Sequence, residues 1–151
     1  MIRTALIFMI AFALAACGPA RLEETRQPLP TASADWASIK FTQSGGIMGM
    51  SRTIEIASDG TWKFIDERAS ETRTGKLSTD ELKQLNGLIA SFSVKPSGQS
   101  GVCADCFIYS IEISSSGKPL TAEADDVNLG DSGLGPLVDF MTNLMSEALT
   151  K

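Results

Sequence analysis

Two cysteines with Cys-x-x-Cys spacing, Cys103 and Cys106, are the residues in this chain best placed for thiol chemistry. Such a pair acts as a redox couple when it opens a helix, because the helix N-terminus lowers the pKa of the attacking thiol. Here the pair precedes an alternating, strand-like segment, residues 107–114. A zinc site would need further cysteine or histidine ligands, and the chain has no histidine. The pattern therefore favours a structural disulfide that fixes a loop before a strand.

The third cysteine, Cys17, ends an N-terminal segment with a positively charged start and an apolar run over residues 6–14. This layout is typical of a secretory signal, and the run is too short for a transmembrane helix. The string Leu-Ala-Ala-Cys over residues 14–17 resembles the lipobox of bacterial lipoproteins. The resemblance implies that the Cys17 thiol carries a diacylglycerol and that palmitate or a similar acyl chain is added.

This interpretation divides the chain into three parts. We expect residues 1–16 to be the signal peptide, residues 17–35 to be the lipidated cysteine with a flexible tether, and residues 36–151 to be one folded domain. Three prolines and few large apolar residues in the tether argue against a packed core there. Gly18 stands where lipoproteins of the inner membrane often have Asp. We therefore expect a cell-envelope protein anchored in a lipid bilayer through acylated Cys17, on the outer membrane and facing the periplasm.

Composition argues against several functions. The absence of histidine excludes Ser-His-Asp and Cys-His nucleophilic machinery, which needs an imidazole to move the proton. The net charge of −5, with no cluster of basic residues, disfavours nucleic acid as a partner. No residue spacing indicates a metal or cofactor site. We therefore expect a protein that is not an enzyme.

A glycine-rich segment contains Gly45, Gly46, Ile47, Met48 and Gly49. It lacks the Gly-Lys-Ser/Thr ending of a phosphate-binding loop. One interpretation is a hairpin turn or bulge that glycine permits, with both apolar residues in the core. The other is an exposed loop that offers Ile47 and Met48 to a partner protein.

An acidic segment, residues 125–131, has some features of a calcium loop. Asp126 and Asn128 fit the first two ligand positions, but Gly130 and Leu137 stand where further oxygen ligands belong. The sequence favours a solvated acidic loop.

Hydrophobic periodicity predicts the elements that position these segments. Apolar residues alternate in three early strands, and the alternation places Trp62, Phe64 and Asp66 on one face of the third. Short connections predict two to four antiparallel strands before residue 78. A second group alternates over residues 107–114, and a further strand is predicted over residues 120–124.

Two helices are predicted. Ser78 and Glu81 have the spacing of a capping box, and the helix after them has one apolar stripe. The second helix begins near Pro136. Its expected buried residues are Leu137, Val138, Met141, Leu144, Met145 and Ala148. The order strands, helix, strands, helix predicts an α+β fold in which two helices cover an antiparallel sheet of about four to six strands.

With these elements placed, residues 39–49 (IKFTQSGGIMG) look like the opening of the emfourin family, small bacterial inhibitors of thermolysin-like metalloproteases. The later layout, with a helix over residues 77–92, a strand over residues 105–111 and a turn at Gly117, is similar too. The resemblance covers residues 38–149 and implies the same fold and a metalloprotease partner. The lipobox and the Cys103–Cys106 pair depart from the family pattern.

These observations predict a lipid-anchored envelope protein that binds another protein, with inhibition of a thermolysin-like metalloprotease as the sharpest hypothesis. The alternative is a structural or assembly lipoprotein of the cell envelope that inhibits nothing.

Overall fold

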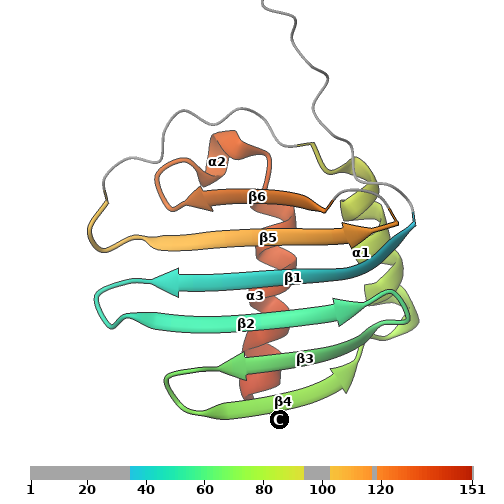
Figure 1. Cartoon of the computed structure of the whole chain (residues 1–151), viewed down its shortest axis with the longest axis horizontal. Coiled ribbons are helices and arrows are strands. Elements are labelled where there is room, and N and C mark those ends of the chain that lie inside the picture. The colour runs from blue at the N-terminus through green and yellow to red at the C-terminus, as the bar shows by residue number, and fades with distance from the viewer. Residues whose placement is uncertain (1–34, 94–102, 117–118, 151) are drawn as a thin grey trace, which may run out of the picture.

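The computed structural model describes residues 35–93, 103–116 and 119–150, which form six strands and three helices (Figure 1). All strand pairings are antiparallel, in the order β4-β3-β2-β1-β5-β6. The strands are β1 (Trp36–Gly45), β2 (Met50–Ala57), β3 (Thr61–Asp66), β4 (Glu71–Lys76), β5 (Phe107–Ser115) and β6 (Leu120–Asp125). The helices are α1 (Thr79–Ser91), α2 (Leu129–Ser132) and α3 (Gly135–Thr150). The predicted α+β class with an antiparallel sheet is confirmed.

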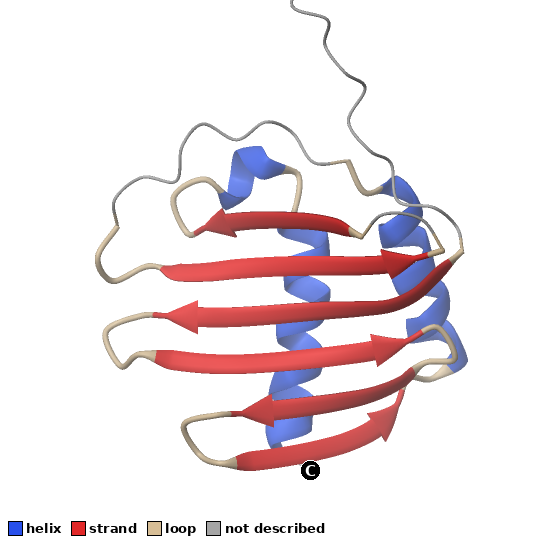
Figure 2. Ribbon diagram, in the orientation of Figure 1, coloured by secondary structure: helices blue, strands red, loops and turns tan. Residues whose placement is uncertain are grey.

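The core lies between the sheet and the two long helices, which pack on the same face of the sheet (Figure 2). Successive side chains of a strand point to opposite faces, so alternate residues of β1 and β2 enter this core. Ile39, Phe41 and Ile54 are completely buried. The opposite face is polar. On it, Lys40 is in register with Glu55 on one side and Glu112 on the other.

Helix α1 begins as its sequence predicts. The Ser78 hydroxyl accepts from the Glu81 backbone N–H, and the Glu81 carboxylate accepts from the Ser78 N–H, which together form the capping box. The helix ends at Ser91, and the predicted stop signals Pro96 and Gly98 lie outside the described residues. The Trp36 indole N–H donates to the Asn86 side-chain carbonyl at 2.8 Å, which ties α1 to the first strand.

Helix α3 crosses the middle of the sheet (Figure 1). All six residues expected on its buried face are buried, together with Phe140. The helix starts at Gly135, one residue before Pro136, which occupies the first turn, where its missing N–H costs no hydrogen bond.

Strand β4 is the one strand of the described sheet that hydrophobic periodicity does not locate. It reads Glu-Thr-Arg-Thr-Gly-Lys and has no large apolar residue, because it lies at the edge of the sheet. The Trp62 ring of β3 fills the space above Gly75, where an added Cβ would lie 2.2 Å from the ring atom Cζ2. An aromatic ring thus replaces the side chain that the edge glycine lacks.

Candidate partner-binding site at one end of the sheet

The turn between β1 and β2, residues 46–49, holds two of the largest exposed apolar side chains in the described part of the chain. Ile47 is 87% exposed and Met48 is 71% exposed. The Gly49 N–H donates to the Gly46 carbonyl at 2.9 Å and closes the turn. Gly46 and Gly49 have φ values of 70° and 59°, which glycine adopts at little cost. The structure therefore places Ile47 and Met48 at the tip of a tight hairpin, outside the core.

The turn is held on one side by the segment that contains the disulfide. Cys103 and Cys106 form the predicted disulfide, with a Cα–Cα distance of 5.4 Å. The Cys106 carbonyl accepts from the Gly46 N–H at 3.1 Å, and a Cβ on Gly45 would lie 2.4 Å from that same oxygen. The Phe107 ring covers Gly46. Backbone that approaches this closely explains why two consecutive glycines stand at this point.

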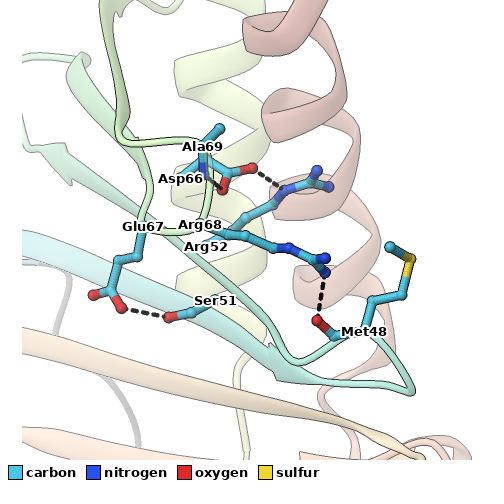
Figure 3. A network of polar contacts seen from close by, with 7 residues as sticks. All are labelled: Met48, Ser51, Arg52, Asp66, Glu67, Arg68 and Ala69. Carbon is cyan, nitrogen blue, oxygen red and sulfur yellow. Dashed lines mark hydrogen bonds and ion pairs between the residues drawn. The ribbon is translucent and has the colours of Figure 1, made fainter.

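On the other side the turn is held by the β3–β4 turn, residues 67–70. The Arg68 guanidinium donates to the Met48 carbonyl (Figure 3). Next to this contact, the Asp66 carboxylate accepts from the Ala69 N–H at 3.0 Å and from Arg52 Nε at 2.8 Å. The buried Asp66 therefore joins β2 to β3 and the β3–β4 turn, and Arg68 joins that turn to the β1–β2 turn.

The charge of Asp66 is held by its surroundings. The Ala69 N–H, followed by the Arg52 guanidinium, keeps the pKa of the Asp66 carboxyl below its ordinary value, although burial acts in the opposite direction. Ser70 completes the turn with a φ of 53°, a conformation that residues other than glycine seldom adopt. On the opposite side of the same turn, the Ser51 hydroxyl donates to the Glu67 carboxylate at 2.9 Å (Figure 3).

The start of β5 is held by Asp126, the residue directly after β6. The Asp126 carboxylate accepts from the Phe107 N–H at 2.7 Å and from the Tyr109 hydroxyl at 2.8 Å. Burial, with the neighbouring Asp126 carboxylate, raises the pKa of Tyr109 to about 12. The Tyr109 ring stacks on Phe41 with a centroid distance of 6.3 Å. The residues that contact the glycine turn are thus anchored to the core.

The expectation of a solvated acidic loop over residues 125–131 was wrong in part. Asp125 is buried at the end of β6, and its carboxylate accepts from the Val127 and Asn128 N–H groups, both at 2.9 Å. The one-turn helix α2 follows. The polar pattern is explained by this local turn, in which side-chain oxygens replace missing backbone partners.

Two shallow hollows flank the hairpin tip. The larger, of about 490 Å³, lies between the two turns and is lined by Met48, Met50, Arg52, Asp66, Arg68 and Ala69. The smaller, of about 270 Å³, lies on the disulfide side and is lined by Asp105, Phe107 and residues of the glycine turn. The arrangement combines exposed apolar side chains with adjacent concave surface, which suits binding to a protein surface.

The geometry also bears on the chemistry available here. Cys106 is followed directly by β5, so no helix N-terminus activates its thiol. In the described ranges, no three histidine, cysteine or carboxylate side chains are grouped as metal ligands. The site offers contact surface, two guanidinium groups and backbone polar groups.

The sequence identified part of this site. It indicated residues 45–49 and the Cys103–Cys106 pair, and the structure brings them into contact. It missed Arg52 on β2 and Arg68 in the turn after β3, and it gave Asp66 on β3 no role in a site. The polar Asp66 in an otherwise apolar alternation was the one available signal. Cys17, the expected signal peptide and all of the expected tether except its last residue, Asp35, lie outside the described residues.

No protein-family model matches this chain, and no curated protein matches it. None of the helices in the described ranges is long and apolar enough to cross a membrane.

Proposed function

We propose that this chain is a lipid-anchored envelope protein that binds another protein through the tip of its β1–β2 hairpin. The observation that carries the proposal is the exposure of Ile47 and Met48 on a turn held from both sides. Burying one such side chain against a partner contributes about 1.5–3 kcal/mol. Because the Cys106 carbonyl and Arg68 already hold the turn, little conformational entropy is lost on binding.

The sharpest form of the proposal is inhibition of a thermolysin-like metalloprotease. The resemblance of residues 39–49 to emfourins suggests this class of partner. Proteases of this class favour a bulky apolar residue directly after the cleaved bond. Ile47 or Met48 would fill that pocket and place a nearby backbone carbonyl close to the protease zinc.

The test measures cleavage of a peptide substrate by thermolysin with increasing amounts of the full chain. The test variant carries Ile47→Asp with Met48→Asp. Val127→Asp is the matched control, because Val127 is also an exposed apolar residue, 67% exposed, but lies on the β6–α2 connection. We expect inhibition by the wild type and the control at micromolar concentration. The double variant should inhibit at least about 100-fold more weakly, since each 1.4 kcal/mol is tenfold in affinity.

Circular dichroism shows whether the double variant folds, as expected for substitutions at an exposed tip. Mass spectrometry of the mixture separates an inhibitor, which stays intact, from a substrate, which is cleaved. Absence of inhibition by the wild type at micromolar concentration would contradict the inhibitor proposal and favour the structural or assembly role.

Lipid anchoring at Cys17 is a separate part of the proposal and rests on the N-terminal sequence alone. Two or more acyl chains hold a protein stably on a membrane, since each buried CH₂ contributes about 0.8 kcal/mol. Metabolic labelling with a fatty-acid analogue should mark the wild type and leave Cys17→Ser unmarked. Equal labelling of the two proteins would exclude this anchor.

A further inference from the structure

The larger hollow beside the hairpin tip has a lining that is apolar and positively charged. Met48 and Met50 contribute thioether side chains, and Arg52 and Arg68 contribute guanidinium groups. Figure 3 shows both guanidinium groups on the side of the turns to which the Met48 side chain projects. A ligand that enters this hollow meets cations beside apolar surface.

The donors of Arg52 are only partly used. Its Nε atom donates to Asp66, and within the described ranges no group accepts from its two terminal nitrogens. Its side chain is 29% exposed, so these donors are within reach of a ligand. Arg68 uses one donor for the Met48 carbonyl and is otherwise exposed at the turn.

The negative groups nearby are already engaged. Glu67 accepts from the Ser51 hydroxyl on the side of the turn opposite the two guanidinium groups (Figure 3). Asp66 is 5% exposed and accepts from Ala69 and Arg52. Glu71, in register with Asp66 on the edge strand, pairs with Arg73. Two cations and one buried anion therefore line the hollow, and the charge it presents is positive although the chain carries −5 overall.

We propose that this hollow is a subsite for a carboxylate, and that it takes an acidic side chain of the partner protein while Ile47 enters an adjoining apolar pocket of that partner. The inference rests on the proposed function and specifies its partner. A planar guanidinium matches the two oxygens of a carboxylate, and the methionines pack against the aliphatic stem of the acidic residue. The net negative charge of the chain disfavours an anionic membrane surface as the occupant.

The first experiment uses a small probe and needs no partner. The full chain is titrated with N-acetyl-glutamate methylamide, while NMR follows the arginine Nε–Hε signals and the methionine methyl signals. The glutamine analogue differs only in lacking the carboxylate. Met141 and Met145 are buried in α3 and serve as internal references.

We expect saturable shifts of Arg52, Arg68, Met48 and Met50 in the millimolar range, with none from the glutamine analogue. Arg68→Gln should weaken binding several-fold, and Arg52→Gln should do the same if it folds. Lys83→Gln removes an equal charge from exposed Lys83 on α1, outside the hollow, and should leave binding unchanged. Equal shifts from both compounds, stronger binding of inorganic phosphate, or an equal effect of Lys83→Gln would overturn the subsite.

A second measurement separates this inference from the proposed function. If the glutamate compound binds as expected but thermolysin is not inhibited, the subsite stands and the protease partner is wrong. If thermolysin is inhibited equally by the wild type and Arg68→Gln, and the glutamate compound does not bind, the subsite is wrong and the proposed function stands.

Discussion

The contact between Gly45 and the Cys106 carbonyl predicts that two glycines of the same turn differ greatly in their tolerance of alanine. Gly45 has a φ of 99°, and its added Cβ would lie 2.4 Å from a backbone oxygen. Gly49 has a φ of 59°, and no atom lies within 4 Å of its added Cβ. The two substitutions add the same methyl group a few residues apart, so each is the control for the other.

The expected magnitudes follow from these environments. In Gly49→Ala the left-handed conformation costs about 1–2 kcal/mol, and the stiffer unfolded chain returns about 0.4–1 kcal/mol. The net loss is roughly 1 kcal/mol. In Gly45→Ala the φ lies further from the left-handed minimum and costs about 1–3 kcal/mol. The Cys106 carbonyl must also move away from Gly46, which loses a hydrogen bond of about 1 kcal/mol. After the same return from the stiffer unfolded chain, the net loss is about 2 kcal/mol.

Thermal unfolding, followed by the fluorescence of the buried Trp36 and Trp62, measures the difference in stability. The Tm of Gly45→Ala should fall by roughly 8 °C, and that of Gly49→Ala by roughly 4 °C, at about 4 °C per kcal/mol for a domain of this size. Equal losses in the two variants would show that the disulfide segment yields to the methyl group. The reasoning that the turn is held rigidly from this side would then be refuted.

Three further predictions concern the groups around the site. Replacing Cys103 and Cys106 by serine should lower the free energy of unfolding by about 2 kcal/mol or less, because the loop that the disulfide closes is short. The same replacement should speed hydrogen exchange of the Gly46 amide, and an unchanged rate would show that the Cys106 carbonyl is positioned without the disulfide. Tyr109 is the sole tyrosine, so ultraviolet titration reports it alone and should give a pKa of about 12 in the folded protein. Because the folded protein holds the Tyr109 proton more tightly than the unfolded chain does, the free energy of unfolding should fall as pH rises from about 10 through about 12. Tyr109→Phe should not show that fall. Because the pKa of Asp66 is lowered in the folded protein, its charge should stabilise the fold above the ordinary pKa of 3.8, and this stabilisation should be lost as pH falls through the depressed pKa. Asp66→Asn should lower the free energy of unfolding by about 1–3 kcal/mol at neutral pH and make stability less dependent on pH in the acid range.

Much of the fold could be predicted from the sequence, because its determinants are local. The capping box of α1 needs only Ser78 and Glu81, and the buried face of α3 needs only helical periodicity. Strand β4 could not be located in this way, because an edge strand with polar residues has no apolar alternation. Asp125 was misjudged because its carboxylate is satisfied by backbone N–H groups two and three residues later.

The candidate site was predictable only where one segment carried the signal. The glycines around Ile47 and Met48 indicated a turn, but not that it touches Cys106, which is distant in the sequence and brought close by the β1–β5 pairing. The role of Arg68 could not be predicted for a different reason. An exposed arginine in a turn belongs to no sequence pattern, and its hydrogen bond depends on the neighbouring hairpin, which brings the Met48 carbonyl within reach.

The exposed tip argues for a partner because its arrangement is unfavourable without one. In the described ranges four large apolar residues are exposed, and two of them, Ile47 and Met48, are adjacent on one turn. Hydration of apolar side chains favours their burial, and a flexible turn would let them fold back onto the neighbouring Met50 or Phe107. The Gly46 and Arg68 hydrogen bonds instead hold the turn from opposite sides. Holding apolar groups in water has no benefit for folding, whereas for binding it removes the ordering cost beforehand. By the same reasoning, the glycines and Arg68 should matter to the proposed binding as much as the two residues that they present.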